Sequence, residues 1–267
     1  MPFLTLLLAA LIQGITEFLP VSSSGHLILL PQLTGMADQG QIIDVAVHVG
    51  TLFAVIIYFW KDASAALFGL PRALCGKIDT SGAFMALCLI IATIPVVIIG
   101  LILKLTGLDD MMRNITVIGW TMLIFGLVLY WADQTGKTER NADQWTLRHA
   151  LLMGLWQAIS LIPGTSRSGI TISAARRFGY KRADGAKISM LMSIPTIIAS
   201  GVLLGGEVIM TADAQAAKDA AIAAILAFFA ALFALSIMMR LLRTVSFTPY
   251  VIYRIILGIA LLSIGYT

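Results

Sequence analysis

The chain has 267 residues, of which 59% are hydrophobic and only 12% are charged, and its mean hydropathy is +0.93. This composition excludes an ordinary soluble domain and indicates an integral membrane protein. The formal net charge of +4 is small and lies mostly in a few loops, so it does not indicate nucleic-acid binding. The two cysteines, Cys75 and Cys88, offer no disulfide framework, and we interpret both as packing residues.

Six uninterrupted apolar segments are long enough to cross a bilayer, and they cover residues 41–60, 83–106, 115–132, 185–207, 217–239 and 249–266. Two further segments are interrupted by proline and glycine: 3–19 with 27–35, and 147–162 with 169–175. Each piece falls short of the roughly 20 residues that a spanning helix needs. We predict that both are re-entrant hairpins. No Lys or Arg precedes Lys61, so we do not expect a cleaved signal peptide.

The order of segments repeats once along the chain. Starts at residues 3 and 41 recur at 147 and 185, and starts at 83 and 115 recur at 217 and 249. The predicted fold is therefore an all-α integral membrane protein, a single membrane domain over 1–267. It consists of repeats 1–132 and 145–267, joined by a cytoplasmic loop at about 133–148. Each repeat holds one hairpin and three spans, and an odd number of spans gives the repeats inverted topology.

The distribution of Lys and Arg supports this topology. Twelve of them fall in loops that it places in the cytoplasm, residues 61–82, 133–148, 176–184 and 240–248, whereas Arg113 is the one in a loop placed outside. This is the asymmetry that the positive-inside rule predicts. The first hairpin then enters from outside and the second from the cytoplasm. We expect their tips to meet near the midplane and to form the functional site.

One motif occurs at both hairpin tips. Residues 13–25 and 157–169 align without gaps, with identities at Gln13/Gln157, Ile15/Ile159, Ser22/Ser166, Ser24/Ser168 and Gly25/Gly169. Glu17 and His26 belong to the first copy, and Arg167 belongs to the second. A charge near the bilayer centre costs about 2.5–3.5 kcal/mol, so Glu17 and Arg167 each need compensation. A metal ion or a shared anionic ligand would provide it, and an ion pair that only locks the hairpins together is the alternative.

Hydroxyl groups near both charges favour an anion-binding site over an ion pair that only holds the hairpins together. Five serines lie where the second half of each hairpin begins: Ser22, Ser23, Ser24, Ser166 and Ser168. Capping of free backbone amides would explain them. Two helix N-termini beside an arginine, however, also form a site for a highly charged anion such as a phosphate. Serine, His26 and a carboxylate are the parts of nucleophilic catalysis, which suggests phosphoryl transfer or hydrolysis.

At these motifs the chain resembles the bacterial undecaprenyl-diphosphate phosphatases, membrane enzymes of the bacitracin-resistance type. The first matching motif is Glu/Gln-x-x-x-Glu, here Gln13 to Glu17 and onward to His26, and the second is Pro-Gly-x-Ser-Arg-Ser-x-x-Thr at residues 163–171. The resemblance implies hydrolysis of undecaprenyl diphosphate to undecaprenyl phosphate and inorganic phosphate. This reaction recycles the lipid carrier for cell-wall synthesis and confers bacitracin resistance. The resemblance also implies a bacterial inner-membrane location and a site opening to the periplasmic face.

The resemblance also implies roles for individual residues. The catalytic ones are Glu17, Ser23 as favoured nucleophile, His26 as general acid or base, and Arg167 as the clamp on the diphosphate. Substrate-binding residues are Ser22, Ser24, Gly25, Gly164, Thr165, Ser166, Ser168 and Thr171. A divalent cation, Mg²⁺ or Ca²⁺, is expected on Glu17 and Gln13, although Gln13 stands where the family often has Glu. The sequence leaves open whether Ser23, His26 or a metal-bound water attacks.

Expected partners are the polyprenyl diphosphate substrate and membrane lipids, and a homodimer is compatible with the sequence without being indicated by it. A polyprenyl-phosphate transporter is the alternative function, because inverted repeats with broken helices are typical of transporters. A relation to acid-phosphatase-type lipid phosphatases is disfavoured, since no histidine follows His149. Asp44 and His48 are four residues apart at the start of a span and face one way; they would support the site or, as we favour, have an interfacial or helix-start role. We also interpret His149 as interfacial.

Overall fold

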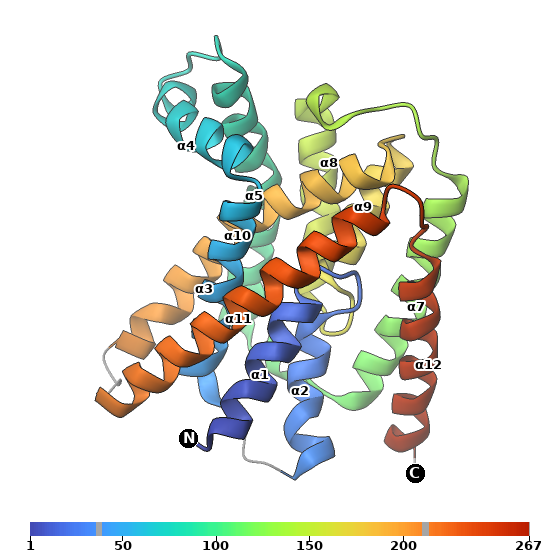
Figure 1. The fold of residues 1–267 in the computed structure, drawn as a ribbon. Helices are drawn as coiled ribbons and strands as arrows, with labels where there is room; N and C mark the ends of the chain where they lie inside the picture. Colours follow the sequence, from blue (N-terminus) through green and yellow to red (C-terminus); the bar gives the residue numbers. More distant parts are fainter. Residues whose placement is uncertain (36–38, 210–213, 267) are drawn as a thin grey trace.

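The computed structural model describes residues 1–35, 39–209 and 214–266, and within these ranges the regular elements are all helices (Figure 1). In chain order they are α1 (Phe3–Thr16), α2 (Ser23–Thr34), α3 (Gly40–Tyr58), α4 (Trp60–Leu74), α5 (Ser81–Thr106), α6 (Leu108–Met111), α7 (Ile115–Thr135), η1 (Ala142–Gln144), α8 (Leu147–Ala158), η2 (Ile159–Leu161), α9 (Arg167–Arg177), α10 (Arg182–Ile209), α11 (Ala214–Leu241) and α12 (Thr248–Gly265). The all-α prediction is confirmed for the described residues.

The six predicted spans are confirmed as helices. Among the described residues, α3, α5, α7, α10, α11 and α12 are long and apolar enough to cross a membrane. Exposed leucine, isoleucine and phenylalanine side chains lie along these helices, as expected for surfaces that face lipid. Together with this length and composition, they make the chain a multi-pass membrane protein.

Four short helices form two pairs whose tips meet inside the bundle. Helices α1 and α2 have 14 and 12 residues, and α8 and α9 have 12 and 11. In Figure 1 the open ends of the two pairs lie at opposite ends of the bundle, and the blue and yellow turns that connect them lie side by side. A direct contact joins the turns, because Ser168 Oγ donates to the carbonyl oxygen of Leu19 at 2.9 Å.

Small residues let the helices around these pairs pack closely. A Cβ atom at Gly50 of α3 would lie 2.1 Å from the carbonyl oxygen of Ala224 in α11, and one at Gly14 of α1 would lie 2.6 Å from Cβ of Ala230. Helix α11 therefore contacts both α3 and α1 at close range, which is how membrane helices gain dispersion energy without a hydrophobic driving force. This packing fixes the first pair against the spans.

A buried arginine on α12 holds both turns. Arg254 is 0% exposed, and its guanidinium donates to the carbonyl oxygens of Pro20 in the first turn at 3.3 Å and of Gly164 and Thr165 in the second at 3.0 and 2.9 Å. It also donates to the carbonyl oxygens of Thr121 and Met122 on α7, both at 3.3 Å. Turn carbonyls lack helical partners, so one fork-shaped donor satisfies several of them at once.

Two expectations about the cytoplasmic loops need correction. Residues 61–82, predicted as a loop, include most of α4. This helix packs closely on the start of α5, since a Cβ atom at Gly69 would lie 2.2 Å from the backbone carbonyl carbon of Gly82. Arg176, assigned to a loop, lies in the last turn of α9 and is 1% exposed; its Nε donates to Oδ1 of buried Asp133 at 3.0 Å. It therefore contributes to a buried ion pair rather than to an exposed positive loop.

Candidate active site

The repeated motif folds the same way in both turns. Ser22 and Ser166 are the N-caps of α2 and α9, and each accepts a hydrogen bond from the amide of the glycine three residues later. Both serines have positive φ, 74° and 71°, which is rare for residues other than glycine. The unusual backbone turns the chain so that both helix N-termini face the same space. Such N-termini carry partial positive charge and attract anions.

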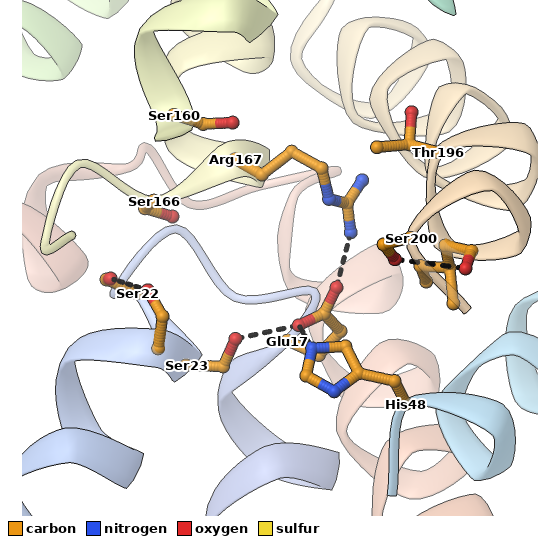
Figure 2. A pocket seen from close by; sticks show the side chains of 11 residues that line it. Glu17, Ser22, Ser23, His48, Ser160, Ser166, Arg167, Thr196 and Ser200 are labelled. Atoms are coloured by element: carbon orange, nitrogen blue, oxygen red, sulfur yellow. Dashed lines mark hydrogen bonds and ion pairs between the residues drawn. The ribbon is translucent and has the colours of Figure 1, made fainter. Parts of the chain in front are cut away.

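Glu17 lies at the centre of the contacts between the turns. Its Oε1 accepts from Arg167 Nη2 at 2.7 Å, and its Oε2 accepts from Ser23 Oγ at 2.7 Å (Figure 2). Oε2 also accepts from Gln13 Nε2 at 2.8 Å. The residue is 8% exposed, so the carboxylate is largely removed from solvent and depends on these donors. The predicted proximity of Glu17 and Arg167 therefore agrees with the geometry of the structure.

Glu17 and Arg167 line a pocket whose walls are rich in hydroxyl groups. The other lining residues are Ser22, Ser23, Ser24, His48, Ser160, Ser166, Thr196, Ile197 and Ser200 (Figure 2). Sequence reasoning missed the wall from α10, Thr196 and Ser200, and also Ser160 of η2. A polar residue inside an apolar span is the signal that would have found the α10 residues.

The remaining predicted binding residues support the turns rather than line this pocket. Gly164 has φ +86°, and a Cβ there would lie 2.2 Å from Oγ1 of Thr121. Thr171 Oγ1 bonds Ser189 Oγ at 2.6 Å, and Thr165 is fully buried. Gly25 is buried, and a Cβ there would lie 3.1 Å from Met122 of α7. Ser168 joins the two turns through Leu19, as described above.

The ring of His26 contacts α12 rather than the pocket. Its Nδ1 lies 2.7 Å from the carbonyl oxygen of Ser22, and its Nε2 lies 2.5 Å from the hydroxyl of Tyr253 on α12, against whose ring it stacks. It does not line the pocket that holds Glu17 and Ser23. Ser23 and His26 are three residues apart on α2 and so lie on neighbouring parts of its surface, but the His26 ring points to α12. The catalytic role of His26 stays a prediction.

His48 is the histidine that lies beside Glu17 in the pocket. Its Nε2 lies 4.0 Å from Glu17 Oε2, and the ring lines the pocket (Figure 2). Its Nδ1 lies 2.7 Å from the carbonyl oxygen of Asp44, one helical turn earlier on α3. The interfacial interpretation favoured for His48 is therefore wrong. Four-residue spacing did indicate that Asp44 and His48 share one face of a helix.

The side chains around Glu17 are compatible with a divalent cation that is completed by the substrate. Within the described ranges no cluster of three or more His, Cys, Asp or Glu could hold a metal ion. Mg²⁺ commonly binds one or two carboxylates together with substrate phosphates and water, so a single carboxylate suffices. Gln13 Oε1 is buried without a hydrogen-bond partner among the described residues, while the amide nitrogen orients Glu17.

Comparison with known proteins assigns the chain to a family. A model of the family described as bacitracin resistance protein BacA matches residues 6–260. The chain belongs to the BacA family. This match covers nearly all described helices and both turns, so the pocket lies within the part that defines the family.

Several BacA relatives are similar over their whole length. The chain is 70% identical over 262 residues to the undecaprenyl-diphosphatase of Ruegeria pomeroyi, covering 98% of each chain. It is 69% identical over 266 residues to the undecaprenyl-diphosphatase of a Jannaschia species, covering 100% of both. It is 43% identical over 272 residues to undecaprenyl-diphosphatase 1 of Rhodospirillum rubrum, covering 100% of this chain and 96% of the relative.

Proposed function

We propose that the protein hydrolyses undecaprenyl diphosphate to undecaprenyl phosphate and inorganic phosphate, and so recycles the lipid carrier and confers bacitracin resistance. Full-length relatives named undecaprenyl-diphosphatase support the substrate. The observation that carries the chemistry is the hydrogen bond from Ser23 Oγ to Glu17 beside Arg167. A hydroxyl whose proton already points at a carboxylate is an activated nucleophile.

Arg167 and the two helix N-termini bind the diphosphate in this proposal. The arginine uses Nη2 for Glu17 and places Nη1 at 3.4 Å from the carbonyl oxygen of Ser189, which fixes the plane of its guanidinium. A planar guanidinium presents several donors and can contact phosphate oxygens while keeping its bond to a carboxylate. Pocket hydroxyls of Ser24 and Ser166 add neutral contacts.

Ser23 Oγ attacks the terminal phosphorus in this proposal. The bond from Ser23 oxygen to phosphorus forms, the bridging oxygen leaves with undecaprenyl phosphate, and Glu17 accepts the serine proton. Glu17 releases that proton to solvent before the second step. Water then attacks the phosphorus of the phosphoserine, Glu17 takes a proton from that water, and the proton passes to Ser23 Oγ as its bond to phosphorus breaks and inorganic phosphate is released. Arg167 offsets negative charge in both steps, which is the main protein contribution to phosphoryl transfer.

A divalent cation, Mg²⁺ or Ca²⁺, is part of the proposal, with Glu17 as its carboxylate ligand. When bound, it would neutralise charge on the diphosphate. Gln13 serves to orient Glu17 and is not itself a pocket-lining residue. Arg167 alone already offsets the charge of Glu17, so further positive charge is needed to balance a diphosphate.

We propose that the helix pairs α1/α2 and α8/α9 are re-entrant hairpins in two inverted repeats. Their open ends lie at opposite ends of the bundle, and both chain termini lie at the same end, as an even number of spans requires (Figure 1). We place the protein in the bacterial inner membrane with the pocket open to the periplasmic side. A polyprenyl chain gains about 0.8 kcal/mol per buried methylene, so only the head group has to enter the pocket.

Transport of polyprenyl phosphate by the same anion site is the second candidate. The two pairs of short helices whose tips meet inside the bundle favour it, because transporter sites are built from broken helices. Transport requires no nucleophile, however, so in a transporter the Ser23–Glu17 hydrogen bond would only stabilise the buried carboxylate.

The test is phosphate release from undecaprenyl diphosphate by the purified protein in detergent, with and without Mg²⁺ or Ca²⁺, for wild type and Glu17→Ala. We expect cation-dependent release that is abolished in the variant, with Glu139→Ala, an exposed glutamate, as the control. Absence of release by well-folded wild type with either cation would refute hydrolysis and leave transport as the candidate.

A further inference from the structure

His48 presents an uncommitted nitrogen to the same pocket as Glu17. A carbonyl oxygen can only accept a hydrogen bond, so the 2.7 Å contact with Asp44 places the proton of the neutral ring on Nδ1. The lone pair is then on Nε2, which points toward Glu17 Oε2 at 4.0 Å. A backbone carbonyl that fixes one ring nitrogen is the usual partner of a histidine that binds metal with the other.

The distance between the two groups is close to that needed for joint binding of one ion. Donors that each lie about 2.1 Å from a metal are about 3.0 Å apart at an angle of about 90° and about 3.4 Å apart at the tetrahedral angle. The 4.0 Å separation is too long for a hydrogen bond, and a small shift of the His48 ring would bring both groups onto one ion. Solvent or substrate can reach the ring, because 36% of the His48 side chain is exposed, compared with 7% for Glu17.

An ion pair between protonated His48 and Glu17 explains the geometry less well. Glu17 already has a full cationic partner in Arg167 at 2.7 Å, together with hydrogen bonds from Ser23 and Gln13. A protonated His48 would be expected to close on the carboxylate to hydrogen-bond distance, as Arg167 does, but Nε2 stays at 4.0 Å. A metal ion, unlike a proton, would hold the two groups apart while binding both.

We propose that His48 Nε2 and Glu17 form a mixed nitrogen and oxygen site for a transition-metal divalent cation such as Mn²⁺, completed by phosphate oxygens and water. The inference rests on the proposed function and refines its cation. Imidazole favours transition metals, whereas Mg²⁺ and Ca²⁺ favour oxygen ligands. The site should therefore bind Mn²⁺ more tightly than Mg²⁺ or Ca²⁺.

Pulsed electron paramagnetic resonance of Mn²⁺ added to the purified full-length protein tests this directly. The chain has three histidines, so His26→Gln, His48→Gln and His149→Gln together assign any imidazole coupling. We expect ¹⁴N coupling in wild type, in His26→Gln and in His149→Gln, and none in His48→Gln. Labelling wild type with ¹⁵N-histidine should change the coupling without any substitution, which covers the case in which a variant misfolds.

Affinity provides the second measurement. His48→Gln should weaken Mn²⁺ binding by at least about tenfold, because even the loss of a residue that only orients a metal ligand lowers metal affinity about 10–100-fold. The same substitution should change Ca²⁺ affinity much less. Absence of Mn²⁺ binding to wild type, absence of ¹⁴N coupling, or coupling retained in His48→Gln would overturn the proposal. Phosphate release with Mg²⁺, measured on the same preparations, shows whether only this inference fails or the proposed hydrolysis as well.

Discussion

The two turns share a sequence motif, yet they contribute different chemistry. Positions that are identical in both build the backbone: Ser22 and Ser166 cap α2 and α9, each pairs with the serine two residues on, at 3.3 and 3.1 Å, and Gln13 and Gln157 are both fully buried. Positions that differ carry the reactive groups. In the gap-free alignment Ser23 corresponds to Arg167, so the proposed nucleophile and the phosphate clamp occupy one position of the motif.

This difference teaches how a duplicated turn can form one asymmetric site. Both copies provide a helix N-terminus with the same rare backbone at the cap. Glu17 of the first copy, whose counterpart is Leu161, then connects the two by accepting from both Ser23 and Arg167. Substitutions at motif positions that are identical in the two turns, compared with substitutions at positions that differ, therefore test this division of roles.

Ser23→Ala should have the largest effect among them. Loss of the attacking oxygen should lower phosphate release by at least about 10⁴-fold, because removal of a serine nucleophile removes the route that depends on it. Ser24→Ala, the neighbouring pocket hydroxyl, should cause a much smaller loss. Rates are compared in detergent at saturating substrate, and a Ser23→Ala enzyme with near-normal turnover would indicate attack by water.

Arg254→Met should affect both turns together. Removal of the guanidinium leaves buried carbonyl oxygens of Pro20, Gly164 and Thr165 without their donor. We expect a loss of about 3 kcal/mol or more in the free energy of unfolding, since each bond to a charged group is worth about 1.5–3 kcal/mol. Denaturant unfolding in detergent measures it, and Arg254→Lys should recover part of the loss. Equal stability of Met variant and wild type would contradict the role of this residue.

His26→Ala should reduce turnover by less than about tenfold. Both ring nitrogens contact groups outside the pocket, namely the carbonyl of Ser22 and the hydroxyl of Tyr253. A residue that transfers protons in the reaction would cost about 10²–10⁴-fold on removal. A loss in that range, accompanied by a changed pH profile of turnover, would show that His26 enters the pocket during catalysis.

The smallest effects are expected at the shared caps. Alanine at Ser22 or at Ser166 should lower stability by about 1 kcal/mol, and glycine by only a few tenths, since glycine adopts positive φ without strain. The two positions should respond alike if the turns are structurally equivalent. Apparent melting temperatures in detergent compare the four variants, and a clear difference between the positions would argue against equivalence.

Most of the fold followed from hydropathy, whereas the site followed only in part. Long apolar runs predicted all six spans, and two runs broken by Pro20 and Pro163 predicted the helix pairs. Helix α4 was missed because it is short and carries Lys61, Asp62 and Arg72, a pattern that also fits a cytoplasmic loop. Local composition cannot distinguish a packed amphipathic helix from such a loop.

Glu17, Ser23 and Arg167 were predictable because each lies inside the repeated motif. The contacts of Arg254 and His48 with the turns were not predicted. These residues lie on α12 and α3, far from the turns in the sequence, and no local pattern indicates which distant segments meet. His26 also lies beside the motif, but its ring contacts Tyr253 of α12, so its catalytic role stays a prediction. A lone arginine in an apolar span was a signal that could have revealed Arg254.

The central claim is that both turns form one site through Glu17 and Arg167. Phosphate release by Glu17→Ala, Arg167→Ala and the double variant tests it most directly. If the residues act as one unit, the double variant should be no slower than the slower single variant, because such effects are not additive. Losses that multiply in the double variant would show that the two residues act independently and would contradict the account.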